Sequence, residues 1–162
     1  MTRTCDWANW LHQELCAWNN GRGKKGPWRF RLPWPPSVNH YWVRNSRGMY
    51  ISLGGKRYRQ EVASIMGLQG VTPKAFYLNP KLQKLHDEAR IFPVRGKVSL
   101  HVHAYPPDRR KRDLDNLAKA LFDALGMAGV FRDDFQIDRF SMARLEPLAG
   151  GLVCVEMEPL DE

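Results

Sequence analysis

The sequence predicts an α+β fold in which β-strands and helices build one domain. Apolar and polar residues alternate in residues 28–32 and 98–104, and this period of two is typical of a half-buried strand. Residues 116–128 instead repeat apolar residues three and four positions apart, which predicts an amphipathic helix. A chain of 162 residues is long enough to bury one hydrophobic core of this kind.

Residues 1–27 are predicted to be an extension that precedes the first strand. Its bulky apolar residues recur at helical spacing and predict a short amphipathic helix: Trp7, Trp10, Leu11, Leu15 and Trp18. The sequence GRGKKG at residues 21–26 then predicts a flexible basic linker. We favour packing of the helix onto its own domain, which would span residues 28–162. As alternatives, this helix could contact a partner chain or lie on DNA.

The first strand is followed by Pro33, Pro35 and Pro36, which end it. Residues 37–58 are then predicted to form a loop that mixes basic, polar and aromatic residues, a composition suited to phosphate contact and base stacking. The candidate DNA contacts in this loop are Asn39, Arg44 and Arg47. Aromatic residues beside a strand also commonly join the core, so both interpretations stay open. A helix is expected at about residues 56–66.

The second half of the chain predicts a short helix at residues 80–90, with Asn79 as its N-cap. Two more strands are expected at residues 136–145 and 151–158, joined as a hairpin by a turn at residues 147–150. His101 and His103 share one face of the strand at residues 98–104. Because no third ligand is nearby in the sequence, we expect an exposed polar face there rather than a metal site.

The charge and the cysteine content indicate which kind of partner the protein binds and in which compartment it is expected. The net charge of +8 and the pI near 9.7 favour an anionic partner without distinguishing nucleic acid from lipid. Basic residues prevail before residue 113 and acidic residues after it. The three cysteines form no Cys-x-x-Cys pair, and no apolar run approaches the roughly 20 residues of a membrane span. We therefore expect a cytoplasmic protein that contacts no membrane.

The most informative stretch is residues 108–119, DRRKRDLDNLAK, in which a basic run passes directly into two aspartates. In extended chain, Asp113 and Asp115 point the same way, whereas within a helix they diverge, so both are expected to precede the helix. Asp115 or Asn116 would then be its N-cap, and Lys119 would lie one turn later.

A third carboxylate is available from Asp133-Asp134, which follows the helix and its closing Gly129. Three converging aspartates beside a basic run predict a Mg²⁺ site, because hard divalent ions prefer carboxylate and water oxygens. Such an ion supports phosphodiester hydrolysis, and a cation such as Lys119 or Arg112 can assist the transition state. Spacing alone leaves the alternative open that these aspartates only cap the helix and shape turns.

Two separated motifs resemble the RusA family of Holliday junction resolvases from bacteria and their prophages. The first is residues 109–119 with the later FDAL, AG and DD sequences, and the second is LPWPPS at residues 32–37 with Asn39. Both occur in the family's order, and the resemblance covers most of residues 28–158. Residues 1–27 lie outside the family core, and a stretch near residues 67–90 resembles an insertion.

This resemblance implies a mixed β-sheet flanked by helices and a homodimer that makes paired, Mg²⁺-dependent nicks across a four-way junction. It implies that Asp113, Asp115 and Asp134 are the essential metal-binding and catalytic aspartates, and that Lys119 and Arg112 are basic active-site residues. The basic run would bind DNA through Arg109, Arg110, Lys111 and Arg112. A two-fold dimer suits a junction that presents two equivalent strands.

Two other functions remain compatible with these residues. One is a nuclease with the same carboxylates that acts on flaps or replication forks. The other is a DNA-binding protein without catalysis, in which the acidic residues are structural.

Overall fold

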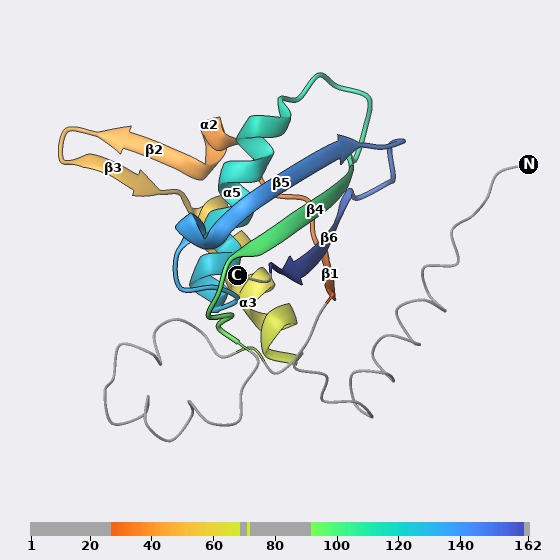
Figure 1. The fold of residues 1–162 in the computed structure, drawn as a ribbon. Coiled ribbons are helices and arrows are strands. Elements are labelled where there is room, and N and C mark those ends of the chain that lie inside the picture. The colour runs from red at the N-terminus through yellow and green to blue at the C-terminus, as the bar shows by residue number, and fades with distance from the viewer. Residues whose placement is uncertain (1–26, 69–70, 72–91, 161–162) are drawn as a thin grey trace, which may run out of the picture.

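A four-stranded sheet forms the centre of the molecule in the computed structural model, which describes residues 27–68, 71 and 92–160 (Figure 1). The strands are β1 (Trp28–Leu32), β4 (Val98–Tyr105), β5 (Ile137–Arg144) and β6 (Leu152–Pro159), in the spatial order β1-β6-β4-β5. β5 runs parallel to β4, whereas the other neighbouring pairs are antiparallel. The expected α+β fold with a mixed sheet is confirmed.

The predicted hairpin between the last two strands is wrong, because β4 lies between β5 and β6. Helix α5 (Leu114–Ala128) connects β4 to β5, and such a crossover returns the chain parallel to the strand that it left. The connection after β5 then crosses the end of β4, where Leu145 N–H donates to Ala104 O and Leu148 N–H to Pro106 O. Both strands lie within two residues of their predicted positions, but the turn between them does not pair them.

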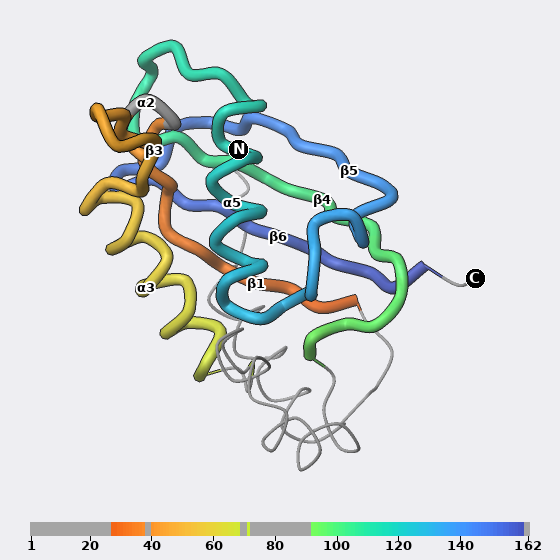
Figure 2. The backbone as a smooth tube through the Cα atoms, turned by 90° about the vertical axis from the view of Figure 1, so that its left-hand side faces the viewer, coloured from red at the N-terminus to blue at the C-terminus, as the bar shows by residue number. Residues whose placement is uncertain are grey.

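Helices α3 (Leu53–Leu68) and α5 pack on one face of this sheet (Figure 2). The alternation predicted for β4 is observed from Leu100 to Ala104, where only His101 and His103 are exposed, whereas Ser99 is buried. His101 is engaged by two serines, with ring nitrogens 3.1 Å from Ser99 Oγ and 2.7 Å from Ser141 Oγ. The polar sheet face that the sequence predicts at the two histidines is confirmed.

Residues 37–58 hold more regular structure than the predicted loop. A short helix α2 (Val38–Tyr41) leads into a two-stranded hairpin of β2 (Trp42–Asn45) and β3 (Gly48–Ile51), which projects away from the main sheet (Figure 1). The Asn45 side chain accepts a hydrogen bond from the Arg47 N–H, and Gly48 has a φ of 127° that other residues rarely adopt. The sequence analysis does not predict this hairpin, because its strands of four residues are too short to show a clear alternation.

Helix α3 begins at Leu53, ahead of the predicted residue 56, because Ser52 caps it through its Oγ, 3.0 Å from the Gly55 N–H. Gly55 permits a close approach to α2, since a Cβ there would lie 3.0 Å from Tyr41 O. The predicted N-terminal helix and basic linker, the helix at residues 80–90, and almost all of the predicted insertion lie outside the described residues. No helix in the described residues combines the length and apolar composition of a membrane span.

Candidate active site

The N-terminus of α5 carries the first two candidate aspartates. The helix begins at Leu114, so Asp113 is its N-cap, with extended backbone angles (φ −86°, ψ 133°), and Asp115 lies in the first turn. The prediction that both aspartates precede the helix is therefore wrong for Asp115. Asp113 is outside the helix and extended, so the divergence of two side chains within a helix does not apply to this pair. The helix dipole also favours a carboxylate in the first turn, where Asp115 lies. The Asp113 side chain makes no capping hydrogen bond.

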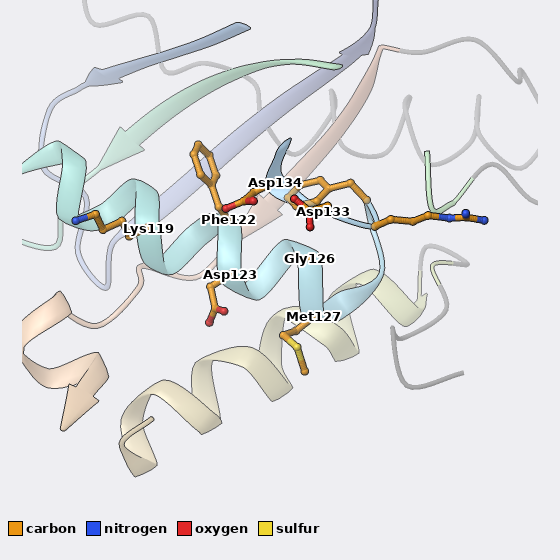
Figure 3. A pocket seen from close by; sticks show the side chains of 9 residues that line it. Lys119, Phe122, Asp123, Gly126, Met127, Asp133 and Asp134 are labelled. Atoms are coloured by element: carbon orange, nitrogen blue, oxygen red, sulfur yellow. The ribbon is translucent and has the colours of Figure 1, made fainter. Parts of the chain in front are cut away.

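Lys119 and Asp134, which the sequence separates by an entire helix, line one cavity of about 300 Å³ between α5 and the loop that follows it (Figure 3). Asp134 is the first residue of the 3₁₀ helix η2 (Asp134–Gln136). The remaining lining residues are Phe122, Asp123, Gly126, Met127, Phe131, Arg132 and Asp133. The predicted return of the chain toward the helix thus places Asp134 beside the same cavity as Lys119.

The two adjacent aspartates of that loop have different roles. Asp133 is the N-cap of η2, where its side chain accepts a hydrogen bond from the Phe135 N–H and Gln136 completes a capping box. Asp134 is exposed and takes no part in that cap. Because the Asp133 carboxylate is engaged in the cap and that of Asp134 is not, Asp134 is the better candidate for the functional carboxylate.

The aspartates of the described chain fall into two groups. Four have structural partners: Asp108 binds Arg110 and Arg112, Asp123 binds Tyr41 and Arg59, Asp133 caps η2, and Asp138 pairs with Lys97. The other three are Asp113, Asp115 and Asp134, which are exposed and have no hydrogen-bond or ion-pair partner within the residues that the structure describes. Within residues 27–68, 71 and 92–160, no hydrogen bond or ion pair supports the alternative in which these three are structural acids.

The three carboxylates do not meet at one point in the single chain. Among residues 27–68, 71 and 92–160, no group of three His, Cys, Asp or Glu side chains is close enough to hold a metal ion. The structure places Asp113 and Asp115 at one end of α5 and Asp134 beside its later turns. The predicted convergence of the three aspartates is therefore not observed in these residues, although Lys119 and Asp134 line one cavity.

The basic run before α5 is organised by Asp108, which the sequence reasoning missed as a functional residue. Its carboxylate accepts hydrogen bonds from Arg110 Nε at 3.0 Å and Nη2 at 2.8 Å, and from both terminal nitrogens of Arg112. Arg112 is half-buried and its guanidinium lies 5.9 Å from the ring centroid of Trp34. These contacts hold the pKa of the Asp108 carboxyl well below its usual range. The Asp-x-Arg spacing was the available signal.

Arg112 is thus engaged by Asp108 in the described chain, and its role at the active site stays a prediction. Arg109 and Lys111 are exposed and have no ion-pair partner in the described part of the chain. On the hairpin, Arg44 and Arg47 are exposed as well. Asn39 lies in α2, and its side chain is outside the description.

A second group that the sequence reasoning missed joins α5 to the rest of the domain. The Tyr41 hydroxyl and the Arg59 guanidinium both donate to the Asp123 carboxylate. Burial, followed by the neighbouring Asp123, raises the pKa of the Tyr41 hydroxyl well above its ordinary value. No local sequence signal joins residues from α2, α3 and α5, so only the tertiary structure reveals this group.

Comparison with known proteins adds independent findings. Residues 33–156 match the model of the family Endodeoxyribonuclease RusA. The chain is 36% identical over 120 residues to Crossover junction endodeoxyribonuclease RusA from Escherichia coli strain K12, covering 74% of this chain and 84% of that protein. Proteins of the same name are 38% identical in Enterobacteria phage 82, over 120 residues with the same coverage, and 34% identical in Enterobacteria phage HK97. The latter match spans 134 residues, 83% of this chain and 96% of the phage protein.

Proposed function

Because the chain belongs to the RusA family of endodeoxyribonucleases, we propose that it resolves Holliday junctions in DNA recombination and repair at a site built from Asp113, Asp115, Asp134 and Lys119. One observation carries the choice of carboxylates. Of the aspartates in the described chain, only these three have no structural partner. Exposed carboxylates near a basic run would repel a DNA backbone unless a cation lies between them. We place this activity in the cytoplasm.

Mg²⁺ fits these residues without a preformed cage of three carboxylates. The ion commonly keeps several waters and takes one or two carboxylates together with substrate phosphate oxygens. Asp113 and Asp115 would supply the protein oxygens, and Asp134 would join them when DNA is bound. When bound, Mg²⁺ supplies positive charge that stabilises the phosphate oxygens during hydrolysis.

The other residues at the cavity support hydrolysis through charge and position. Lys119 lies one helical turn from Asp115 and lines the same cavity as Asp134, so its ammonium is suited to neutralise charge on the scissile phosphate or the leaving oxygen. Asp134, which η2 contributes to this cavity, is suited to orient a water molecule. The exposed positions of these groups leave room for a nucleic-acid strand.

DNA would be held on both sides of the site. Arg109 and Lys111 extend from the segment before α5, while Arg44 and Arg47 extend from the hairpin β2–β3. Phosphate contacts of this kind position the duplex without reading its sequence. We further propose a homodimer, because two copies related by a two-fold axis would present two sites to the two equivalent strands of a four-way junction.

The proposal is tested by incubating the protein with a labelled four-way junction, a flap and a linear duplex, each with Mg²⁺ or with EDTA. Symmetrical paired nicks in the junction alone, lost in EDTA, are the expected result. Preferred cleavage of the flap would instead identify a flap nuclease. Absence of cleavage on every substrate would identify a DNA-binding protein.

The carboxylates are tested with Asp115→Asn and the matched control Asp138→Asn, whose aspartate is exposed but paired with Lys97. Asp115→Asn is expected to bind the junction and to lose at least about a hundredfold in cleavage rate, the scale of a lost transition-state contact. Asp138→Asn is expected to cleave like the unmodified protein. Full cleavage by Asp115→Asn would remove this residue from the site.

A further inference from the structure

Tyr41, Arg59 and Asp123 form a closed triangle of hydrogen bonds. The Tyr41 hydroxyl donates to Asp123 Oδ2, and Arg59 Nε donates both to Asp123 Oδ2 at 2.6 Å and to the Tyr41 oxygen at 2.9 Å. Arg59 also forms an ion pair with Asp123 through Nη2, and its guanidinium lies 5.8 Å from the Tyr41 ring centroid. Each member therefore contacts both of the others.

The triangle joins three helices that lie far apart in the sequence. Tyr41 ends α2, Arg59 lies in α3, and Asp123 lies in α5. The Tyr41 side chain is fully buried, so it anchors the chain at this point. The hairpin begins with the next residue, Trp42, whose ring packs edge-on against Tyr41 with centroids 5.5 Å apart. The Ser52 N–H, just after the hairpin, donates to Tyr41 O at 2.9 Å. Both ends of the hairpin are thus held at Tyr41.

On α5, Asp123 is the member of the triangle that borders the proposed site. Asp123 follows Lys119 by four residues and lines the same cavity as Lys119 and Asp134. In Figure 3 its carboxylate points toward α3, while Asp134 lies on the other side of the helix. The charge of Asp123 is balanced by Arg59, and its oxygen already accepts two donors. It is therefore suited to hold the helix in place and poorly suited to bind a metal ion.

Given the proposed function, we propose that Tyr41, Arg59 and Asp123 are positioning residues that fix the hairpin β2–β3 relative to the cleavage site on α5. A strand held by Arg44 and Arg47 on the hairpin must present its phosphate at Lys119 on α5. The triangle is a polar link between these two surfaces. Loosening it leaves every DNA-contacting and metal-binding side chain present but displaces the phosphate, and misplacement by about 1 Å can cost a hundredfold in rate.

The test compares Tyr41→Phe with Tyr58→Phe. Both changes remove one hydroxyl from a buried ring, but the Tyr58 hydroxyl is buried with no hydrogen-bond partner, so its removal breaks no described contact. Three quantities are measured at a temperature well below unfolding: the cleavage rate of a bound four-way junction in Mg²⁺, the Kd for that junction, and amide exchange of residues 42–51. Asp123→Asn and the double variant Tyr41→Phe/Asp123→Asn complete the set.

Tyr41→Phe is expected to lower the cleavage rate about tenfold and to change the Kd by no more than about twofold, while the amides of the hairpin exchange faster. Because losses within one network are not additive, the double variant should cleave about as slowly as Asp123→Asn. Tyr58→Phe should match the unmodified protein in all three. Unchanged cleavage and exchange in Tyr41→Phe would overturn the proposal, as would an equal loss in Tyr58→Phe. If the unmodified protein cleaves no junction, the proposed function fails, and unchanged hairpin exchange in Tyr41→Phe would separately reject the positioning network.

Discussion

Asp108 binds the guanidinium of Arg112 through two hydrogen bonds, 2.6 Å from Oδ1 to Nη1 and 2.9 Å from Oδ2 to Nη2. The same carboxylate accepts from Arg110. A carboxylate offers arginine the same two-oxygen geometry as a phosphate does, so Asp108 competes with the DNA backbone for both arginines. The basic run is consequently less available to an ordinary duplex than its composition suggests.

Asp108→Asn is therefore expected to tighten binding to linear duplex, because an amide holds the guanidinium groups less firmly. The slope of log affinity against log salt should steepen by about 0.9 for each arginine that moves to a phosphate. Binding titrations at four salt concentrations, with duplex and with junction, measure both quantities. Weaker duplex binding at every salt concentration would show instead that Asp108 acts only by holding the arginines in position.

Lys111→Ala tests direct phosphate contact by the basic run. Lys111 is exposed and has no partner within the described chain, so its loss should weaken binding to every DNA sequence alike and lower the salt slope by about 0.9. Arg110→Ala is expected to have a smaller effect, because Asp108 already holds that side chain. Lys97→Ala is a matched control, since Lys97 pairs with Asp138. An unchanged slope in Lys111→Ala would exclude the contact.

The sequence predicted the helices and strands that form from the spacing of neighbouring apolar residues. The alternation in β4 and the periodicity of α5 were sufficient, and Gly129 ends that helix as predicted, in a left-handed conformation (φ 89°). Strand pairing was not predictable in this way. The turn after β5 carries hairpin residues, yet the α5 crossover determines that β5 pairs with β4 and leaves β6 on the other side.

The candidate site shows the same division. Residue type and spacing selected Asp113, Asp115 and Asp134, and the structure adds that the neighbouring Asp108, Asp123 and Asp133 have structural partners. That distinction depends on contacts between distant segments, such as Asp123 with Arg59, which no sequence period encodes. The expected meeting of all three candidate carboxylates also failed in the single chain, because spacing cannot supply the distance between α5 and η2.

Gly151→Ala is expected to destabilise the fold more than Gly150→Ala does. Both glycines have positive φ, 84° at Gly150 and 71° at Gly151, so either alanine costs roughly 1 kcal/mol in backbone strain. An added Cβ at Gly151 would also lie 2.6 Å from the Cβ of Trp34, whereas at Gly150 nothing lies within 4 Å. The difference in the free energy of unfolding, measured in urea, isolates this clash. Equal losses would show that Trp34 moves aside without cost.

Lys119→Met tests the role of the cavity in cleavage. The substitution removes the ammonium but keeps an unbranched side chain, and Lys119 is exposed, so the free energy of unfolding should change by less than about 0.5 kcal/mol. The cleavage rate of a bound junction should fall by about a hundredfold, with a Kd within a few-fold, since the charge acts mainly on the transition state.

A double variant of Lys119 and Asp134 tests more sharply whether the two side chains act together in cleavage. Lys119 and Asp134 line one cavity, so groups that act on the same phosphate should not contribute independently. The double variant Lys119→Met/Asp134→Asn is expected to lose less rate than the product of the two single losses. Lys119→Arg, which keeps the positive charge, should retain more activity than Lys119→Met. Strictly multiplicative losses would mean that Lys119 and Asp134 act on separate steps, and the shared site would have to be abandoned.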